Sequence, residues 1–208
     1  MTDVFLEYRT MEGMSTKHLL IKHPEAKGLI VILPGANNLS DIPVLYLIRK
    51  GVSDKGYDTL NVDYEGILDR DLDREVLFDR LISMVKGLIN QYVETYGETE
   101  VSIVGRSLGS IIGARLYWET ENPFKRVAYI SPTNLTIEEL KAGEGLMFTS
   151  YADEYMDEAA VEKVKGLEGV DLHVYNGADH SLELDGNLDA TIDVIRDVVK
   201  RSVEYLTS

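Results

Sequence analysis

The chain has 208 residues, of which 44% are hydrophobic and 27% charged, and its formal net charge is −15 at pH 7. This length and composition predict a single globular domain over 1–208 and exclude a disordered protein. The negative charge argues against nucleic acid or an anionic membrane as a partner, because both repel a polyanion. The absence of cysteine excludes disulfides, thiolate metal sites and cysteine nucleophiles.

The N-terminal segment has neither the basic region nor the apolar stretch of a signal peptide, and no run of the sequence is long and apolar enough to span a bilayer. We therefore expect a cytoplasmic protein without membrane contact.

The chain opens with two alternating runs, Val4 to Arg9 and His18 to Lys22, joined by a turn-like segment around Gly13. Alternation is typical of strands with one solvated face, so these runs predict an antiparallel hairpin at a sheet edge. We expect His18 and His23 to be surface or pairing residues, because they lie far from the other candidate residues and lack ligand spacing.

Strands and helices then alternate to the end of the chain. The apolar run from Gly28 to Leu33 is typical of a strand buried on both faces of a parallel sheet. By the same patterns, strands are predicted over 57–64, 101–104, 126–130, 146–150 and 170–175, and helices around 42–52, 77–93, 111–117, 156–165 and 188–206. This order predicts an α/β fold: a three-layer sandwich of a mostly parallel eight-stranded sheet with an antiparallel N-terminal edge hairpin and helices on both faces.

The most informative stretch is Gly105-Arg106-Ser107-Leu108-Gly109, which follows an apolar strand and precedes a helix-like segment. This spacing predicts a nucleophile elbow, a strained turn in which flanking glycines let neighbouring backbone approach. The alternative is a glycine-rich turn with a solvated serine. The pentapeptide alone arises by accident in roughly one chain in fifteen of this length, so its strand-to-helix context carries the prediction.

Two later loops carry residues that would complete a catalytic site. Asp153 follows the strand over 146–150, and His180 lies in the loop after the strand over 170–175. Right-handed crossovers put the C-terminal ends of parallel strands at one edge of the sheet, where sites in such sheets lie. The order Ser107, Asp153, His180 therefore predicts a triad for nucleophilic acyl transfer, with His180 as base and Asp153 fixing its tautomer.

Other residues compete for these roles. Asp157 lies a helical turn beyond Asp153, and His173 falls inside an alternating strand, so we prefer Asp153 and the loop residue His180. Asp179 adjoins His180, but adjacent side chains diverge, which makes it a poor orienter.

With these residues, the chain resembles the α/β-hydrolases over nearly its whole length. The motifs that carry this resemblance are the elbow, the acid in Ser150-Tyr151-Ala152-Asp153 and the histidine in Gly177-Ala178-Asp179-His180. The resemblance implies an oxyanion hole formed by the backbone N–H groups of Leu108 and of Ala36 in Pro34-Gly35-Ala36. Proline replaces a histidine that is usual in the family, which leaves the backbone donor in place.

The segment between Ser107 and Asp153 has room for two strands and a short excursion, so we expect no cap domain. The chain is similar to small lidless members, of the dienelactone-hydrolase-like and small esterase types, although it lacks the cysteine nucleophile of dienelactone hydrolase. The family often ends its fourth strand with Asp-Tyr-Arg-Gly-x-Gly, whereas this chain has Asp63-Tyr64-Glu65-Gly66-Ile67-Leu68 there.

Arg106 is an unusual residue to find beside the nucleophile. We expect its side chain to form an ion pair with Asp63 or Glu65 rather than to contact the substrate.

The leading hypothesis is a serine hydrolase that cleaves a small carboxylic ester through an acyl-enzyme, without metal or cofactor. The alternatives are a thioesterase or small peptidase on the same triad, and a non-catalytic ligand-binding member of the fold. Polar and aromatic loop residues would line an open, shallow pocket: Asn37, Asn38, Tyr64, Glu65, Thr133, Asn134, Tyr151 and Tyr155. Of these, we assign substrate binding to Asn37, Tyr64 and Tyr151, and we expect a monomer or homodimer.

Overall fold

The structure, a computed structural model, describes residues 1–10, 13–37, 40–69, 71–119, 124–140 and 144–208. One eight-stranded sheet runs through it in the order β1-β2-β4-β3-β5-β6-β7-β8. Its strands are β1 (Thr2–Arg9), β2 (Ser15–Lys22), β3 (Leu29–Leu33), β4 (Asp58–Asn61), β5 (Val101–Arg106), β6 (Arg126–Ile130), β7 (Gly145–Thr149) and β8 (Val170–Val174). The strands from β3 to β8 are parallel, whereas β1 and β2 form an antiparallel hairpin at one edge.

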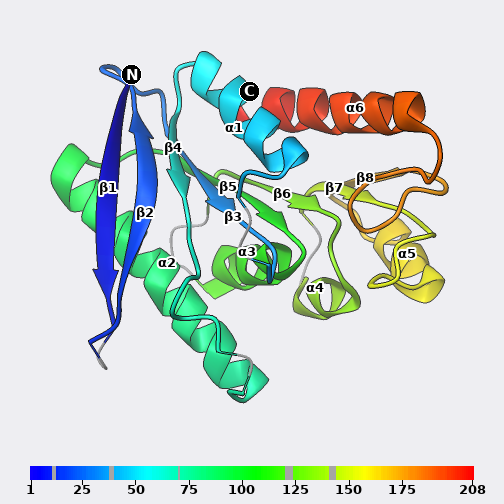
Figure 1. Cartoon of the computed structure of the whole chain (residues 1–208), viewed down its shortest axis with the longest axis horizontal. Coiled ribbons are helices and arrows are strands. Elements are labelled where there is room, and N and C mark those ends of the chain that lie inside the picture. Colours follow the sequence, from blue (N-terminus) through cyan, green and yellow to red (C-terminus); the bar gives the residue numbers. More distant parts are fainter. Residues whose placement is uncertain (11–12, 38–39, 70, 120–123, 141–143) are drawn as a thin grey trace.

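Helices cover both faces of this sheet (Figure 1). They are α1 (Pro43–Asp54), α2 (Arg74–Tyr96), α3 (Leu108–Glu119), α4 (Asn134–Glu139), α5 (Glu158–Lys165) and α6 (Leu188–Leu206). The pair α1 and α6 packs on one face, and α2 to α5 pack on the other. The predicted three-layer α/β sandwich with its N-terminal edge hairpin is confirmed. None of the described helices combines the length and hydrophobicity that a membrane crossing requires.

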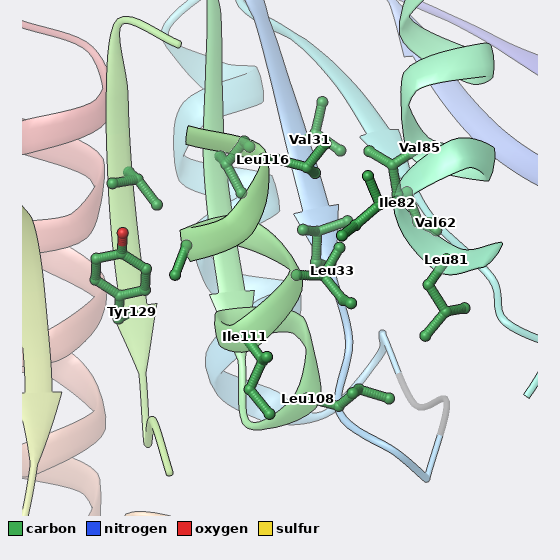
Figure 2. Packing of buried hydrophobic residues seen from close by; sticks show 14 of the residues in the cluster. Val31, Leu33, Val62, Leu81, Ile82, Val85, Leu108, Ile111, Leu116 and Tyr129 are labelled. Carbon is green, nitrogen blue, oxygen red and sulfur yellow. The ribbon is translucent and has the colours of Figure 1, made fainter. Parts of the chain in front are cut away.

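The hydrophobic core has one cluster on each face of the sheet. Every residue of β3 is buried, because alternate side chains enter the two clusters. Figure 2 shows Val31 and Leu33 of this strand between α2 and α3, in the same cluster as Leu108 and Ile111 at the start of α3. Burial of these side chains holds the first turn of α3 against the sheet.

Two of the differences from the predicted elements bear on the site. The strand expected over 57–64 ends at Asn61, because the chain turns there: the N–H of Glu65 donates to the Asp63 carboxylate at 2.7 Å. The short excursion after β6 contains the helix α4. Among the described residues between Ser107 and Asp153, the elements are α3, β6, α4 and β7, which agrees with the expected absence of a cap.

His18 lies in the interior rather than on the surface. Its Nδ1 accepts a hydrogen bond from the Asp63 N–H at 3.0 Å, and its Nε2 lies 2.6 Å from the Thr16 hydroxyl. Burial lowers the pKa of His18 to about 4, although the nearby Asp63 opposes the shift. The imidazole is therefore neutral in the folded protein near neutral pH.

We expect His18 to make the protein less stable as the pH falls from about 6.5 towards 4. In that window the imidazole takes up a proton in the unfolded chain but not in the folded one, so acid favours unfolding. With a folded pKa of about 4, the free energy of unfolding should fall by on the order of 2 kcal/mol between pH 7 and pH 5. Urea unfolding at both pH values measures this for the wild type and for His18→Gln. The variant should lose less stability between the two pH values, and an equal loss in both proteins would contradict the prediction.

Candidate active site

Ser107 lies in the tight turn between β5 and α3. Its φ of 52° is in the left-handed region, which is strained for a residue with a side chain. Two backbone hydrogen bonds hold the turn: the Ser107 N–H donates to Ile130 of β6 at 3.1 Å, and the Ser110 N–H donates to the Ser107 carbonyl at 2.9 Å. The serine is thus presented at the C-terminal edge of the sheet, in the conformation expected of a nucleophile elbow.

Gly105 and Gly109 flank the serine because neighbouring backbone leaves no space for a side chain. A Cβ on Gly105 would lie 2.3 Å from the carbonyl oxygen of Gly109, and a Cβ on Gly109 would lie 2.2 Å from that of Leu33. Both distances are far shorter than a van der Waals contact. The close backbone approach predicted from the spacing is therefore present on both sides of Ser107.

His180 and Asp153 are hydrogen-bonded to one another. The Nδ1 atom of His180 lies 2.8 Å from Oδ2 and 3.0 Å from Oδ1 of Asp153. The Asp153 side chain is 1% exposed, and its Oδ1 also accepts the Tyr155 N–H at 2.9 Å. Because a carboxylate only accepts hydrogen bonds, it places the imidazole proton on Nδ1 and leaves the lone pair on Nε2.

Ser107 and His180 line one cavity of about 650 Å³, which the loops after β3, β5, β7 and β8 enclose. Its other lining residues are Ala36, Asn37, Arg106, Ala152, Glu154, Tyr155, Asp179 and Ser181. The Tyr155 ring packs against the His180 imidazole with centroids 4.5 Å apart. The structure thus brings the predicted nucleophile and base to one cavity, with the predicted acid bonded to the base. Among the described residues, no three His, Asp or Glu side chains gather as a metal site would require.

The two residues predicted to supply the oxyanion donors both lie close to Ser107. Leu108 is the first residue of α3, where backbone N–H groups have no partner within the helix. Ala36 lines the cavity, and the loop that carries it runs close to the elbow, since a Cβ on Gly35 would lie 3.4 Å from the Ser107 Cβ. A helix N-terminus and an adjacent loop can together stabilise a developing negative charge.

Two of the three residues predicted to contact substrate lie away from the cavity. Tyr64 is completely buried in the core cluster beneath α2, because the turn after β4 carries its ring into the interior. Tyr151 is not among the residues that line the cavity; its hydroxyl instead donates to Glu162 of α5 at 2.7 Å. Asn37 does line the cavity. Asn38 lies outside the described residues.

The competing acid and histidine have structural partners of their own. Asp157 caps α5 by accepting the Ala160 N–H at 2.8 Å, and its other oxygen accepts from the Asn134 amide at 2.7 Å. The His173 ring stacks on Phe148, with centroids 5.3 Å apart. Neither Asp157 nor His173 lines the cavity.

Arg106 does not pair with Asp63 or Glu65 as the sequence suggested. In the structure its Nη2 donates to the backbone carbonyl of His180 at 3.0 Å. Burial lowers the pKa of Arg106, and the carboxylates of Asp153 and Asp179 oppose that shift. The expectation was wrong because β3 separates β5 from β4, so the loop after β4 is two strands away.

Comparison with known proteins identifies the fold. No family model matches the chain, and no curated protein matches it. The solved structure of an esterase from Pyrococcus furiosus, Pf2001, is 16% identical with a TM-score of 0.75, over 99% of this chain and 92% of that one. Est1E from Butyrivibrio proteoclasticus is 14% identical with a TM-score of 0.74, over 99% of both chains. XC6422 from Xanthomonas campestris, described as an α/β serine hydrolase without lid, is 15% identical with a TM-score of 0.73, over 97% of this chain and 94% of that one. At such identities the likeness concerns the fold, and the chain has the lidless α/β-hydrolase fold.

Proposed function

We propose that this protein is a serine hydrolase that cleaves small carboxylic esters through an acyl-enzyme. The observation that carries the proposal is the hydrogen bond of 2.8 Å between His180 and Asp153 in a cavity that Ser107 also lines. The esterases among proteins of the same fold support ester hydrolysis over other reactions of this triad.

The reaction follows from the placement of these groups. Ser107 Oγ attacks the ester carbonyl while His180 Nε2 takes its proton, and the Asp153 carboxylate stabilises the imidazolium that forms. The N–H groups of Leu108 and Ala36 donate to the oxyanion. The imidazolium then gives its proton to the leaving alcohol. Water, activated by His180 in the same way, releases the acid and restores the serine.

Turnover of three chromogenic substrates tests the proposed reaction class. The purified protein should hydrolyse p-nitrophenyl acetate faster than an acyl thioester or an aminoacyl p-nitroanilide. Faster turnover of the thioester or of the anilide would favour a thioesterase or a peptidase on the same triad. A protein inert towards all three would be better described as a ligand-binding member of the fold.

We expect specificity for short, uncharged acyl chains. Charged and polar residues line the cavity around Ser107, among them Asn37, Arg106, Glu154 and Asp179. Burial of a CH₂ group contributes about 0.8 kcal/mol to the binding free energy. Carbons of the acyl chain that extend beyond this cavity stay in water and should therefore contribute nothing to binding. The net charge of −15 also disfavours anionic substrates.

A series of p-nitrophenyl esters measures this preference. The value of kcat/KM should not rise from acetyl to palmitoyl, and it should not jump above the critical micelle concentration, since the fold has no lid to open. An apolar groove between α1 and α6, lined by Leu47, Leu188 and Ile192, shares Asp179 with the cavity. A kcat/KM that rises with acyl-chain length would contradict the prediction and would indicate that the acyl chain binds in this groove.

A further inference from the structure

The Arg106 guanidinium touches two loops that carry groups of the proposed site. Its Nη2 donates to the His180 carbonyl at 3.0 Å, in the loop after β8. Its Nη1 lies beside Gly35, where a Cβ would stand 3.1 Å away, in the loop after β3. One side chain, on the residue next to the nucleophile, therefore donates to the histidine loop and lies close to the loop of the predicted oxyanion donor Ala36.

Strand pairing does not link the His180 loop directly to the strand that leads into Ser107. Strand β5 pairs with β3 and β6, whereas β8 lies three strands away from it, beyond β6 and β7. The buried Ala178 and Leu182 anchor the His180 loop in the core, and two side chains from other segments contact His180 itself. Asp153 holds the imidazole ring, and Arg106 holds the backbone of the same residue.

The burial of Arg106 indicates that its hydrogen bonds matter. The residue is 7% exposed, and a buried charge is costly unless it is paired and hydrogen-bonded. The nearby carboxylates of Asp153 and Asp179 supply the opposite charge. A planar guanidinium presents several donors in a fixed geometry, whereas the lysine ammonium is a single point on a flexible stem.

We propose that Arg106 is a positioning residue, which ties the His180 loop and the Gly35 loop to the nucleophile so that base and oxyanion donor stay in register with Ser107. This role rests on the function proposed above. Arg106 acts through His180 and Gly35, and its loss should slow the chemical step more than it weakens substrate binding.

The test compares Arg106→Met, which keeps the length of the side chain but removes its donors, with the wild type. Arg115→Met is the matched control, because Arg115 is a similarly enclosed arginine that pairs with Glu75 and Glu139 away from the cavity. A misplacement of about 1 Å costs on the order of 100-fold in rate, so kcat of Arg106→Met should fall about that much while KM changes little. Arg115→Met should keep its kcat.

The rate of labelling by a fluorophosphonate gives a second readout, since the probe needs the nucleophile, base and oxyanion donors but not the contacts of an ester substrate. It should fall in parallel with kcat. A raised KM with unchanged kcat, or unchanged labelling, would make Arg106 a substrate contact and overturn the proposal. If Arg106→Met does not fold, Arg106→Lys decides: kcat should fall about tenfold because one ammonium cannot serve both loops, and a wild-type kcat would overturn the proposal.

The wild type and Ser107→Ala are measured in the same assay. Ser107-dependent hydrolysis by the wild type supports the proposed function, and the outcomes given above for the Arg106 variants then decide the Arg106 proposal alone. Hydrolysis that does not depend on Ser107 would instead refute the proposed function itself.

Discussion

Ser107→Ala should abolish ester hydrolysis and leave the fold intact. The substitution removes one hydroxyl oxygen from a residue that lines the cavity, and no core contact depends on that atom. Loss of the nucleophile of such a triad costs on the order of 10⁴-fold or more in kcat. Turnover of p-nitrophenyl acetate measures the loss, and thermal unfolding shows whether the variant is folded.

Ser110→Ala is the matched control for Ser107→Ala. Ser110 lies in the first turn of α3, three residues after Ser107, but its hydroxyl is buried and donates to the Gly105 carbonyl at 2.8 Å. Its removal should cost about 1 kcal/mol of stability and preserve most of the turnover. Hydrolysis by Ser107→Ala at close to the wild-type rate would show that the elbow does not supply the nucleophile.

Asp153→Asn should lower kcat by on the order of 10⁴-fold, the loss seen when the aspartate of a serine protease triad is so changed. Asparagine has the same shape, but its NH₂ group can donate to Nδ1 and so favour the tautomer with the proton on Nε2. The imidazole could then no longer take the serine proton. Steady-state kinetics of the folded variant measure the effect.

Asp157→Asn is the control for this second substitution. Asp157 serves as the N-cap of α5, and asparagine caps helices about as well as aspartate, so both activity and stability should change little. The two histidines give a parallel comparison, because His180 lines the cavity and His173 does not. His180→Ala should be inactive, whereas His173→Ala should retain turnover. Equal damage from Asp157→Asn and Asp153→Asn would overturn the assignment of the acid.

Features that depend on local sequence could be predicted well. The unbroken burial of β3 follows from its apolar run, because both faces of a parallel sheet are covered. At the glycines around Ser107 a Cβ would lie less than 3 Å from neighbouring backbone, which no other residue tolerates, so the spacing itself is informative. Asp153 and His180 lie within hydrogen-bond distance of one another, as expected for residues that follow parallel strands, since the ends of such strands share one edge of the sheet.

Features that depend on tertiary contacts could not be predicted. Arg106 donates to a backbone carbonyl in a loop three strands away. Every residue has a backbone carbonyl, so the sequence does not indicate which residue accepts this hydrogen bond. Tyr64 looked like a loop residue at the site, but β4 ends early and the turn buries the ring. Tyr151 follows β7 as expected, but its hydroxyl donates to Glu162 of α5 and the residue does not line the cavity.

Covalent labelling with a fluorophosphonate, read by mass spectrometry of the intact and digested protein, tests the central claim most directly. The reagent needs an activated serine but no knowledge of the natural substrate. One adduct should form, on the peptide that contains Ser107. It should be lost in Ser107→Ala and strongly slowed in His180→Ala. Failure of the folded wild type to react, or an adduct on a different serine, would contradict the assignment of Ser107 as the nucleophile.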